Sequence, residues 1–160
     1  MRHRWITAAV LALGFACSAP VNQGNTRARD GTALTSAAAA FIQIYGATVA
    51  AARRDTLAQF YHPDGAILVV DGQRSRLTRA GLDSLYRGPW IPPIFFAWDS
   101  LTYDQLGPSQ VMATGSFRWQ DPGQADTSRY VYAVLLETAG DRLAIRLEHE
   151  TRCRQYCSWP

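Results

Sequence analysis

The sequence predicts a single domain of the α+β class, with helices first and a meander of antiparallel strands after them. Apolar residues recur at three- and four-residue spacing between residues 37 and 54, which indicates an amphipathic helix. Beyond residue 110 apolar and polar residues alternate, which is typical of strands with one buried face. The 160 residues, 48% of them hydrophobic and 18% charged, fit one globular domain.

Residues 1–17 have the pattern of an export leader. A positive start, Met1–Arg4, precedes an apolar stretch, Trp5–Ala16, that is too short to span a membrane. Cys17 follows this stretch directly and resembles the lipidated cysteine of bacterial lipoproteins. We therefore expect an exported protein, periplasmic or tethered to a cell-envelope membrane through a lipid on Cys17 alone.

The lipoprotein pattern is incomplete, because Gly14 and Phe15 depart from its usual residues. Plain cleavage near Ala16 or Ala19 is the alternative. Residues 18–33 are polar and Gly-containing, and we expect them to form a flexible tether before a domain at residues 34–152.

The charge balance excludes one class of partner. The net charge is +3, but removing residues 1–16, which hold Arg2 and Arg4, leaves 14 basic residues (16 minus 2) against 13 acidic ones. A nearly neutral chain without a basic run lacks the charge that nucleic acid binding requires. We expect no nucleic acid partner.

The three cysteines leave two near the C-terminus once Cys17 is used as an anchor. Cys153 and Cys157 would close a short disulfide in an oxidising compartment, provided that the chain turns between them. Such a bridge would fix the tail, residues 153–160. A metal or redox site at these cysteines is the alternative, but no third ligand lies nearby.

Three helices are expected in the first part of the domain. Asp55–Tyr61 follows the helix at residues 37–54 and has Asp55 as its predicted N-cap. Thr78 is the predicted N-cap of a third helix, Arg79–Arg87, which would pack through Leu82 and Leu85.

The expected strands are bounded by turn residues. His62–Gly65 and Asp71-Gly72 are turns by composition, and they enclose an apolar strand, Ala66–Val70. Prolines make residues 90–98 a poor start for a central strand. The remaining strands are expected at Asp99–Leu106, Gln110–Trp119, Ser128–Glu137 and Leu143–Thr151.

The last expected strand places a histidine among apolar residues. Strict alternation sets Leu143, Ile145, Leu147, His149 and Thr151 on one side and Arg146, Glu148 and Glu150 on the other. His149 would then face a cavity, if the sheet encloses one, or be a hydrogen-bonded histidine of the core.

Four segments follow one another along the expected domain: Phe60–Ala66, Asp71-Gly72, Gly115–Trp119 and Ile145–Thr151. Together they resemble the nuclear-transport-factor-2-like (NTF2-like) superfamily and its SnoaL-like branch, over about residues 35–152. The resemblance implies a cone, in which helices pack on a strongly curved antiparallel sheet that encloses an apolar pocket.

The resemblance also implies where chemistry would lie. Enzymes of the superfamily place a carboxylate or a His-Asp pair inside the pocket, and isomerase-like members have the base on the first strand. Leu68–Val70 occupy those positions here and hold no carboxylate, while the nearby Asp71 is better explained as a turn residue. His149, as general acid–base, and Tyr45, as an oxyanion donor, are the candidate catalytic residues. For Tyr45 the alternative is a packing role in the core.

Aromatic residues are the other candidates for the pocket wall. The sequence shows no metal-ligand spacing, and we expect neither a metal nor another cofactor. The candidate lining residues are Tyr45, Trp90, Phe95, Trp98, Trp119, Tyr130, Tyr132 and His149.

Two functions are compatible with these features. The first is an exported domain that binds a small apolar ligand or another protein. The alternative is an enzyme of the isomerase, cyclase or dehydratase type that uses His149 in the pocket. Whether the chain is an enzyme does not follow from the sequence. A homodimer formed through the outer face of the sheet would be compatible with either function.

Overall fold

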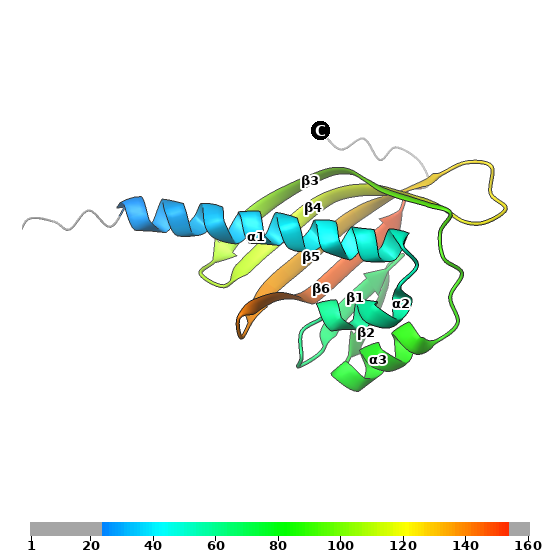
Figure 1. Ribbon diagram of the computed structural model, residues 1–160, viewed down its shortest axis with the longest axis horizontal. Helices are drawn as coiled ribbons and strands as arrows, with labels where there is room; N and C mark the ends of the chain where they lie inside the picture. Colours follow the sequence, from blue (N-terminus) through cyan, green and yellow to red (C-terminus); the bar gives the residue numbers. More distant parts are fainter. Residues whose placement is uncertain (1–23, 154–160) are drawn as a thin grey trace, which may run out of the picture.

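The computed structural model describes residues 24–153 as a helical layer on one mixed sheet (Figure 1). The elements, in chain order, are α1 (Gly24–Ala50), α2 (Arg54–Leu57), the 3-10 helix η1 (Ala58–Phe60), β1 (Ala66–Val70), β2 (Gln73–Leu77), α3 (Arg79–Arg87), β3 (Phe95–Gly107), β4 (Gln110–Gln120), β5 (Ser128–Ala139) and β6 (Arg142–Arg152).

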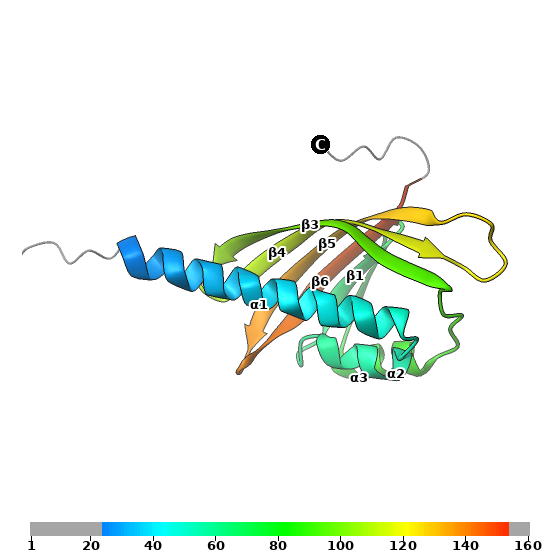
Figure 2. The ribbon, with the colours of Figure 1, turned by 45° about the horizontal axis from the view of Figure 1, so that its top comes forward.

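The six strands have the spatial order β2-β1-β6-β5-β4-β3. Neighbouring strands are antiparallel except β1 and β6, which are parallel, so the expectation of a purely antiparallel sheet is corrected at this one pair. The long helix α1 crosses the concave face of the sheet, while α2 and α3 lie together beside β1 and β2 (Figures 1 and 2). This arrangement confirms the α+β class.

The core lies between α1 and the concave face. Ala38, Ile42, Tyr45 and Val49 recur at helical spacing and are buried. They meet the inward residues of β4, β5 and β6 in one apolar cluster. Within the described residues, Thr32–Ala50 is a helical stretch long and apolar enough to cross a membrane, and its contact with the sheet accounts for that composition.

Two features of β3 and β4 allow the sheet to curve. The pairing register shifts between Trp98 and Ser100, which leaves Asp99 as an extra residue in β3. Opposite this bulge, a Cβ atom on Gly115 would lie 1.9 Å from the carbonyl oxygen of Ser100, so only glycine fits there. Bulges and strand glycines bend sheets in this way, and the bend brings the sheet around α1.

A second bulge, in β6, decides which side chains face the core. Leu135 of β5 pairs with Leu147, but the next residue, Leu136, pairs with Ile145, so Arg146 is an extra residue in β6. Because successive residues of a strand point to opposite faces, one extra residue reverses the alternation beyond it. The residues after Arg146 therefore face the opposite way from the expectation of strict alternation.

The side chain of Arg146 holds the bulge from both neighbouring strands. Its Nη1 donates a hydrogen bond of 2.6 Å to the carbonyl oxygen of Gly65, in the turn before β1. Its Nε lies 3.6 Å from Oε2 of Glu137 in β5. The bulge is thus fixed by residues that are distant in the sequence.

Several sequence predictions are confirmed by these elements. The strand at Ala66–Val70 and the helix at Arg79–Arg87 have the predicted bounds, and Oγ1 of Thr78 accepts a hydrogen bond of 3.2 Å from the backbone N–H of Gly81. The long strands β4, β5 and β6 contain the predicted ranges.

Other expectations differ from the structure. Helix α1 begins at Gly24, so residues 24–33 are helical where a flexible tether was expected. It ends at Ala50 because the chain turns at Ala52, which has φ 56°. Arg53, rather than Asp55, is the N-cap of α2, without a side-chain hydrogen bond. Leu82 is buried as expected, but Leu85 is 41% exposed.

The predictions for both termini fall largely outside the described residues. The leader, including Cys17, lies outside them, as does Cys157. Cys153 is disulfide-bonded, and its pairing with Cys157 stays a prediction.

Candidate functional site

A cavity of about 220 Å³ lies between α1, the concave face of the sheet and the α2–α3 pair. Its wall is mainly apolar. Arg54, Glu148 and Glu150 line it with a guanidinium and two carboxyls, and Tyr45, Tyr86 and Tyr132 are the tyrosines that line it. The other lining residues are Val49, Leu57, Leu68, Val70, Leu85, Trp90, Phe96, Trp98, Phe117 and Trp119.

Aromatic rings from three strands form one side of the cavity. The ring centroids of Trp98 and Tyr132 are 4.9 Å apart, and those of Phe96 and Trp98 are 5.0 Å apart. Phe96 also lies 5.4 Å from Phe117. Aromatic rings in contact at these distances form a stable, largely rigid wall, which suits a flat apolar ligand.

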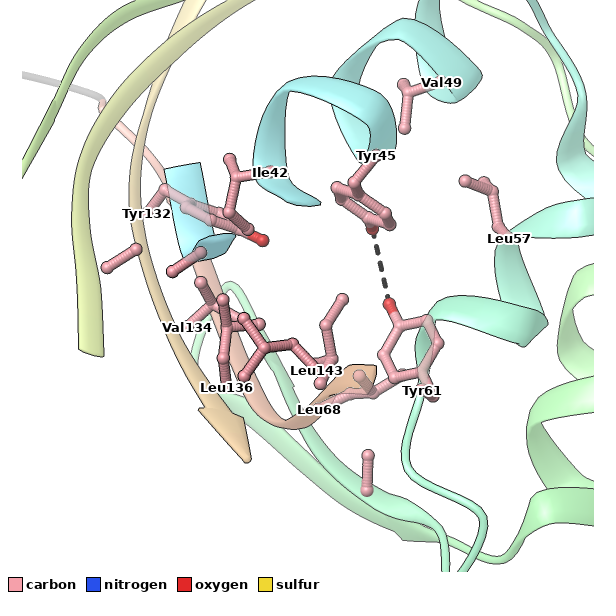
Figure 3. Packing of buried hydrophobic residues seen from close by; sticks show 14 of the residues in the cluster. Ile42, Tyr45, Val49, Leu57, Tyr61, Leu68, Tyr132, Val134, Leu136 and Leu143 are labelled. Atoms are coloured by element: carbon pink, nitrogen blue, oxygen red, sulfur yellow. Dashed lines mark hydrogen bonds between the residues drawn. The ribbon is translucent and has the colours of Figure 1, made fainter. Parts of the chain in front are cut away.

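Glu148 lies at the base of the cavity and is only 7% exposed. Its Oε1 accepts a hydrogen bond of 2.9 Å from the hydroxyl of Tyr132, and its Oε2 accepts one from the hydroxyl of Tyr61. The hydroxyl of Tyr61 is also hydrogen-bonded to Tyr86 and lies 3.4 Å from the hydroxyl of Tyr45 (Figure 3). Four tyrosines thus surround one buried carboxyl.

Burial and hydrogen bonding act in opposite directions on Glu148. Burial raises the pKa of its carboxyl above the ordinary glutamate value, and the hydrogen bonds from Tyr61 and Tyr132 offset only part of that rise. Burial, and then the charge of Glu148, raise the pKa of Tyr61 and Tyr132 well above the ordinary tyrosine value. The hydroxyls therefore stay protonated and donate to Glu148.

Glu150 lies two residues further along β6, on the same face as Glu148. It is paired across the sheet with Tyr132 of β5 and with Val70 of β1. Burial, followed by the charge of Glu148 and that of Asp71, raises the pKa of Glu150 to about 8. Within residues 24–153 the carboxyl of Glu150 accepts no hydrogen bond and forms no ion pair.

The two carboxyls therefore differ in character. Glu148 is fixed by two hydroxyl donors, which favour its charged form. Glu150 has no such donor, and the nearby charge of Glu148 helps it to keep its proton at neutral pH. A partnerless carboxyl that titrates near neutral pH on a cavity wall is suited to general acid–base chemistry.

His149 does not face the cavity, and the expectation that it does was wrong. It lies beyond the Arg146 bulge, so it shares the outer face of the sheet with its pairing partners Ala133 and Val69. Its Nε2 lies 3.1 Å from Oγ1 of Thr151. The extra residue at Arg146 moved His149 out of the cone and brought Glu148 and Glu150 into it.

The aromatic expectations are met at most positions. Five of the predicted residues, Tyr45, Trp90, Trp98, Trp119 and Tyr132, line the cavity. Phe95 does not, because it points to the other face of β3 and is 38% exposed, and Phe96 takes its place. Tyr130 is absent from the lining and stacks on Phe117, with 4.9 Å between the ring centroids.

The turn interpretation of Asp71 is supported by its geometry. Asp71 has φ 48°, and its Oδ1 accepts a hydrogen bond of 2.8 Å from the backbone N–H of Arg152. In the same part of the fold, Leu68 and Val70 line the cavity without a carboxylate, as the sequence predicted. The acids of the site come from the last strand instead of the first.

Sequence reasoning missed the residues that give the site its charge. Glu148 and Glu150 were expected on the solvent side, and Arg54, Tyr61 and Tyr86 were not considered as site residues. Only recognition of a bulge at Arg146 would have identified the two acids. Within the described part of the chain, no group of three or more His, Cys, Asp or Glu side chains converges as metal ligands.

Comparison with known proteins supports the fold. No protein-family model and no curated protein matches the chain. An NTF2-like protein with a cystatin-like fold from Novosphingobium aromaticivorans has a TM-score of 0.64 at 13% identity, over 87% of this chain and 95% of that one.

Two further solved structures are similar to the same extent. A ketosteroid isomerase-like protein from Erwinia carotovora has a TM-score of 0.63 at 12% identity, over 76% of this chain and 97% of that one. A putative scytalone dehydratase from N. aromaticivorans has a TM-score of 0.62 at 8% identity, over 79% and 88%. The cone fold that the resemblance implied is confirmed.

The raised pKa of Glu150 predicts a pH-dependent stability. The folded protein keeps the Glu150 proton up to about pH 8, whereas an ordinary glutamate loses it near 4.5. The resulting stabilisation is complete below pH 4.5, decreases as the pH rises above 4.5, and is fully lost once the pH has risen through 8. Glu150→Gln lacks this loss. Between pH 5 and pH 9 its free energy of unfolding, measured with urea, should therefore increase by about 2 kcal/mol relative to that of wild type, a value reduced for partial solvent exposure.

The matched control is Asp126→Asn, which removes an exposed carboxyl that does not line the cavity. Its free energy of unfolding should follow the wild-type pH profile. Parallel profiles for wild type and Glu150→Gln would show that Glu150 titrates as an ordinary surface acid.

Proposed function

Because the chain has the NTF2-like fold, we propose that its cavity binds a small ring-containing molecule and that Glu150 exchanges a proton with it. The observation that carries this proposal is the partnerless carboxyl of Glu150, with a pKa of about 8, on the wall of an aromatic cavity. Strongly shifted acids in clefts are concentrated at functional sites.

The size of the cavity limits the ligand. A dry cavity of about 150 Å³ holds benzene, so the volume of about 220 Å³ suits one ring with a few substituents. The rings of Phe96, Trp98 and Phe117 offer flat apolar contacts to such a ligand.

Proton transfer is the chemistry that the two carboxyls support. At neutral pH Glu150 mostly carries its proton and acts as a general acid, and its deprotonated fraction acts as a base. Glu148, held by Tyr61 and Tyr132, is the neighbouring carboxyl whose charge, after burial, raises the pKa of Glu150. We infer an isomerase- or dehydratase-type reaction on the ring, in which Glu150 takes the role that the sequence assigned to His149.

Binding without catalysis is the second candidate function. Both oxygens of Glu148 are occupied by tyrosine hydroxyls, so a single carboxyl is left to react with a ligand. A carrier of small apolar molecules would need the aromatic wall and would not need Glu150 to titrate.

A direct test is exchange of the α-protons of cyclohexanone in D₂O, followed by NMR. The base form of Glu150 would remove a proton from the carbon beside the carbonyl and return a deuteron from solvent. The exchange rate should rise with pH and level off above about 8, because Glu150 is then fully deprotonated. Glu150→Gln should reduce the rate by at least about 100-fold, and Asp126→Asn should leave it unchanged.

Two results would contradict the catalytic proposal. Exchange that is equal in wild type and Glu150→Gln would remove Glu150 from the reaction. Saturable binding of cyclohexanone without any exchange above the buffer rate would favour the binding function.

Export and lipid anchoring remain part of the proposed function. They are supported by the positive, apolar and cysteine-containing order of residues 1–17. Labelled palmitate should enter the wild-type chain in a bacterial host and should be absent from Cys17→Ser. Label in both chains would contradict an anchor at Cys17.

A homodimer is proposed through the outer face of the sheet. The helices cover only the concave face (Figure 2), and on the outer face Ile67 pairs with Leu147, which in turn pairs with Leu135. These adjacent apolar residues support a contact with a second copy. Sedimentation equilibrium at micromolar protein concentration should give the mass of a dimer. A single species with the mass of a monomer would contradict the proposal.

A further inference from the structure

Of the described residues that line the cavity, Arg54 is the one cation, and the fold holds it in a defined position. Arg54 is the first residue of α2, directly after the turn that ends α1. Its Nη2 donates a hydrogen bond of 2.9 Å to the carbonyl oxygen of Leu85 in α3. Its Cζ lies 5.7 Å from the ring centroid of Tyr86 and 5.3 Å from that of Trp90.

These contacts leave part of the guanidinium without a partner. Nε of Arg54 is buried and has no hydrogen-bond acceptor among the described residues. Within the same part of the chain Arg54 forms no salt bridge, although Glu148 and Glu150 line the same cavity. A buried N–H without an acceptor is unfavourable, and an acceptor supplied by a ligand would relieve this cost.

The aromatic contacts favour a charged ligand group at this position. Aromatic rings beside a guanidinium fix its orientation and stabilise its positive charge by cation–π attraction, but they do not neutralise that charge. Both oxygens of Glu148, in contrast, already accept hydrogen bonds from the hydroxyls of Tyr61 and Tyr132. Among the described residues Arg54 therefore keeps a buried N–H that no group of the cavity accepts.

We propose that Arg54 is an anion subsite, which binds the carboxylate of a small aromatic or alicyclic acid whose ring fills the aromatic cavity. The planar guanidinium matches a carboxylate, which accepts two N–H groups side by side. This inference rests on the proposed function, because it assigns the substrate class of the same cavity.

The ligand would span the cavity from Arg54 toward Glu150. Its carboxylate accepts from the guanidinium of Arg54, and its ring contacts Trp98 and Phe96. A ring of benzene size with one carboxylate is within the limit set by the volume of about 220 Å³. Such a ligand leaves Glu150 free to exchange a proton with the far side of the ring.

The test is calorimetric binding of benzoate and of its uncharged analogue benzamide to the whole protein at pH 7. Wild type should bind benzoate at least about tenfold more tightly than benzamide, as expected for a hydrogen bond to a charged group. Arg54→Gln should remove this preference and leave benzamide binding within about twofold. Arg54→Lys keeps the positive charge but lacks Nε–H and the planar guanidinium, so it should keep only part of the preference for benzoate over benzamide.

Two controls separate the subsite from general effects. Arg74→Gln removes an exposed positive charge from β2 and should bind both compounds as wild type does. Thermal unfolding of Arg54→Gln reports whether loss of the Leu85 contact opens the α2–α3 pair, and Arg54→Lys provides a second variant if it does.

Three outcomes would overturn the proposal. The first is equal affinity of wild type for benzoate and benzamide, and the second is the absence of benzoate binding. The third is displacement of benzoate by inorganic phosphate with an affinity equal to that of benzoate. The last result would indicate an anion site that does not use the ring. None of them changes the exchange of cyclohexanone protons, so a failure of this inference is distinguishable from a failure of the proposed function.

Discussion

The extra residue at Arg146 is the constraint on which the candidate site depends. Without it, β6 would alternate regularly, and Glu148 and Glu150 would face solvent while His149 faced α1. Arg146 holds the bulge through the carbonyl oxygen of Gly65 and through Glu137. One local irregularity in one strand thus places two acids inside an apolar cone.

Burying a carboxyl costs free energy, and hydrogen bonds from the fold offset this cost for Glu148 but not for Glu150. Hydroxyls of Tyr61 and Tyr132 satisfy Glu148, and these tyrosines come from the end of η1 and from β5. Burial, followed by the charge of Glu148, raises the pKa of Glu150 to about 8, and within residues 24–153 no hydrogen-bond donor offsets this rise. The same environment that makes a buried carboxyl costly makes it reactive near neutral pH, and Arg54 adds an uncompensated positive charge to the cavity.

Local signals were sufficient to predict much of the fold but not the register. The apolar run at Ala66–Val70 and the cap at Thr78 gave correct elements, because their causes lie within a few residues. Strand β2 was not predicted, because four of its five residues are exposed and alternation is lost. The bulge at Arg146 is stabilised by contacts with Gly65 and Glu137, which no local pattern reveals. The aromatic wall was largely predicted, whereas both acids were placed on the wrong face.

The most direct measurement is the titration of the glutamate side-chain carboxyl carbons by ¹³C NMR, with Glu150→Gln used to assign the resonance of Glu150. If the Arg146 bulge turns Glu150 into the cavity beside Glu148, its carbon should titrate with a pKa of about 8. A pKa for Glu150 near the ordinary glutamate value of 4.5 would contradict the account, because it would place this carboxyl in solvent and leave the cavity without the acid that titrates near neutral pH.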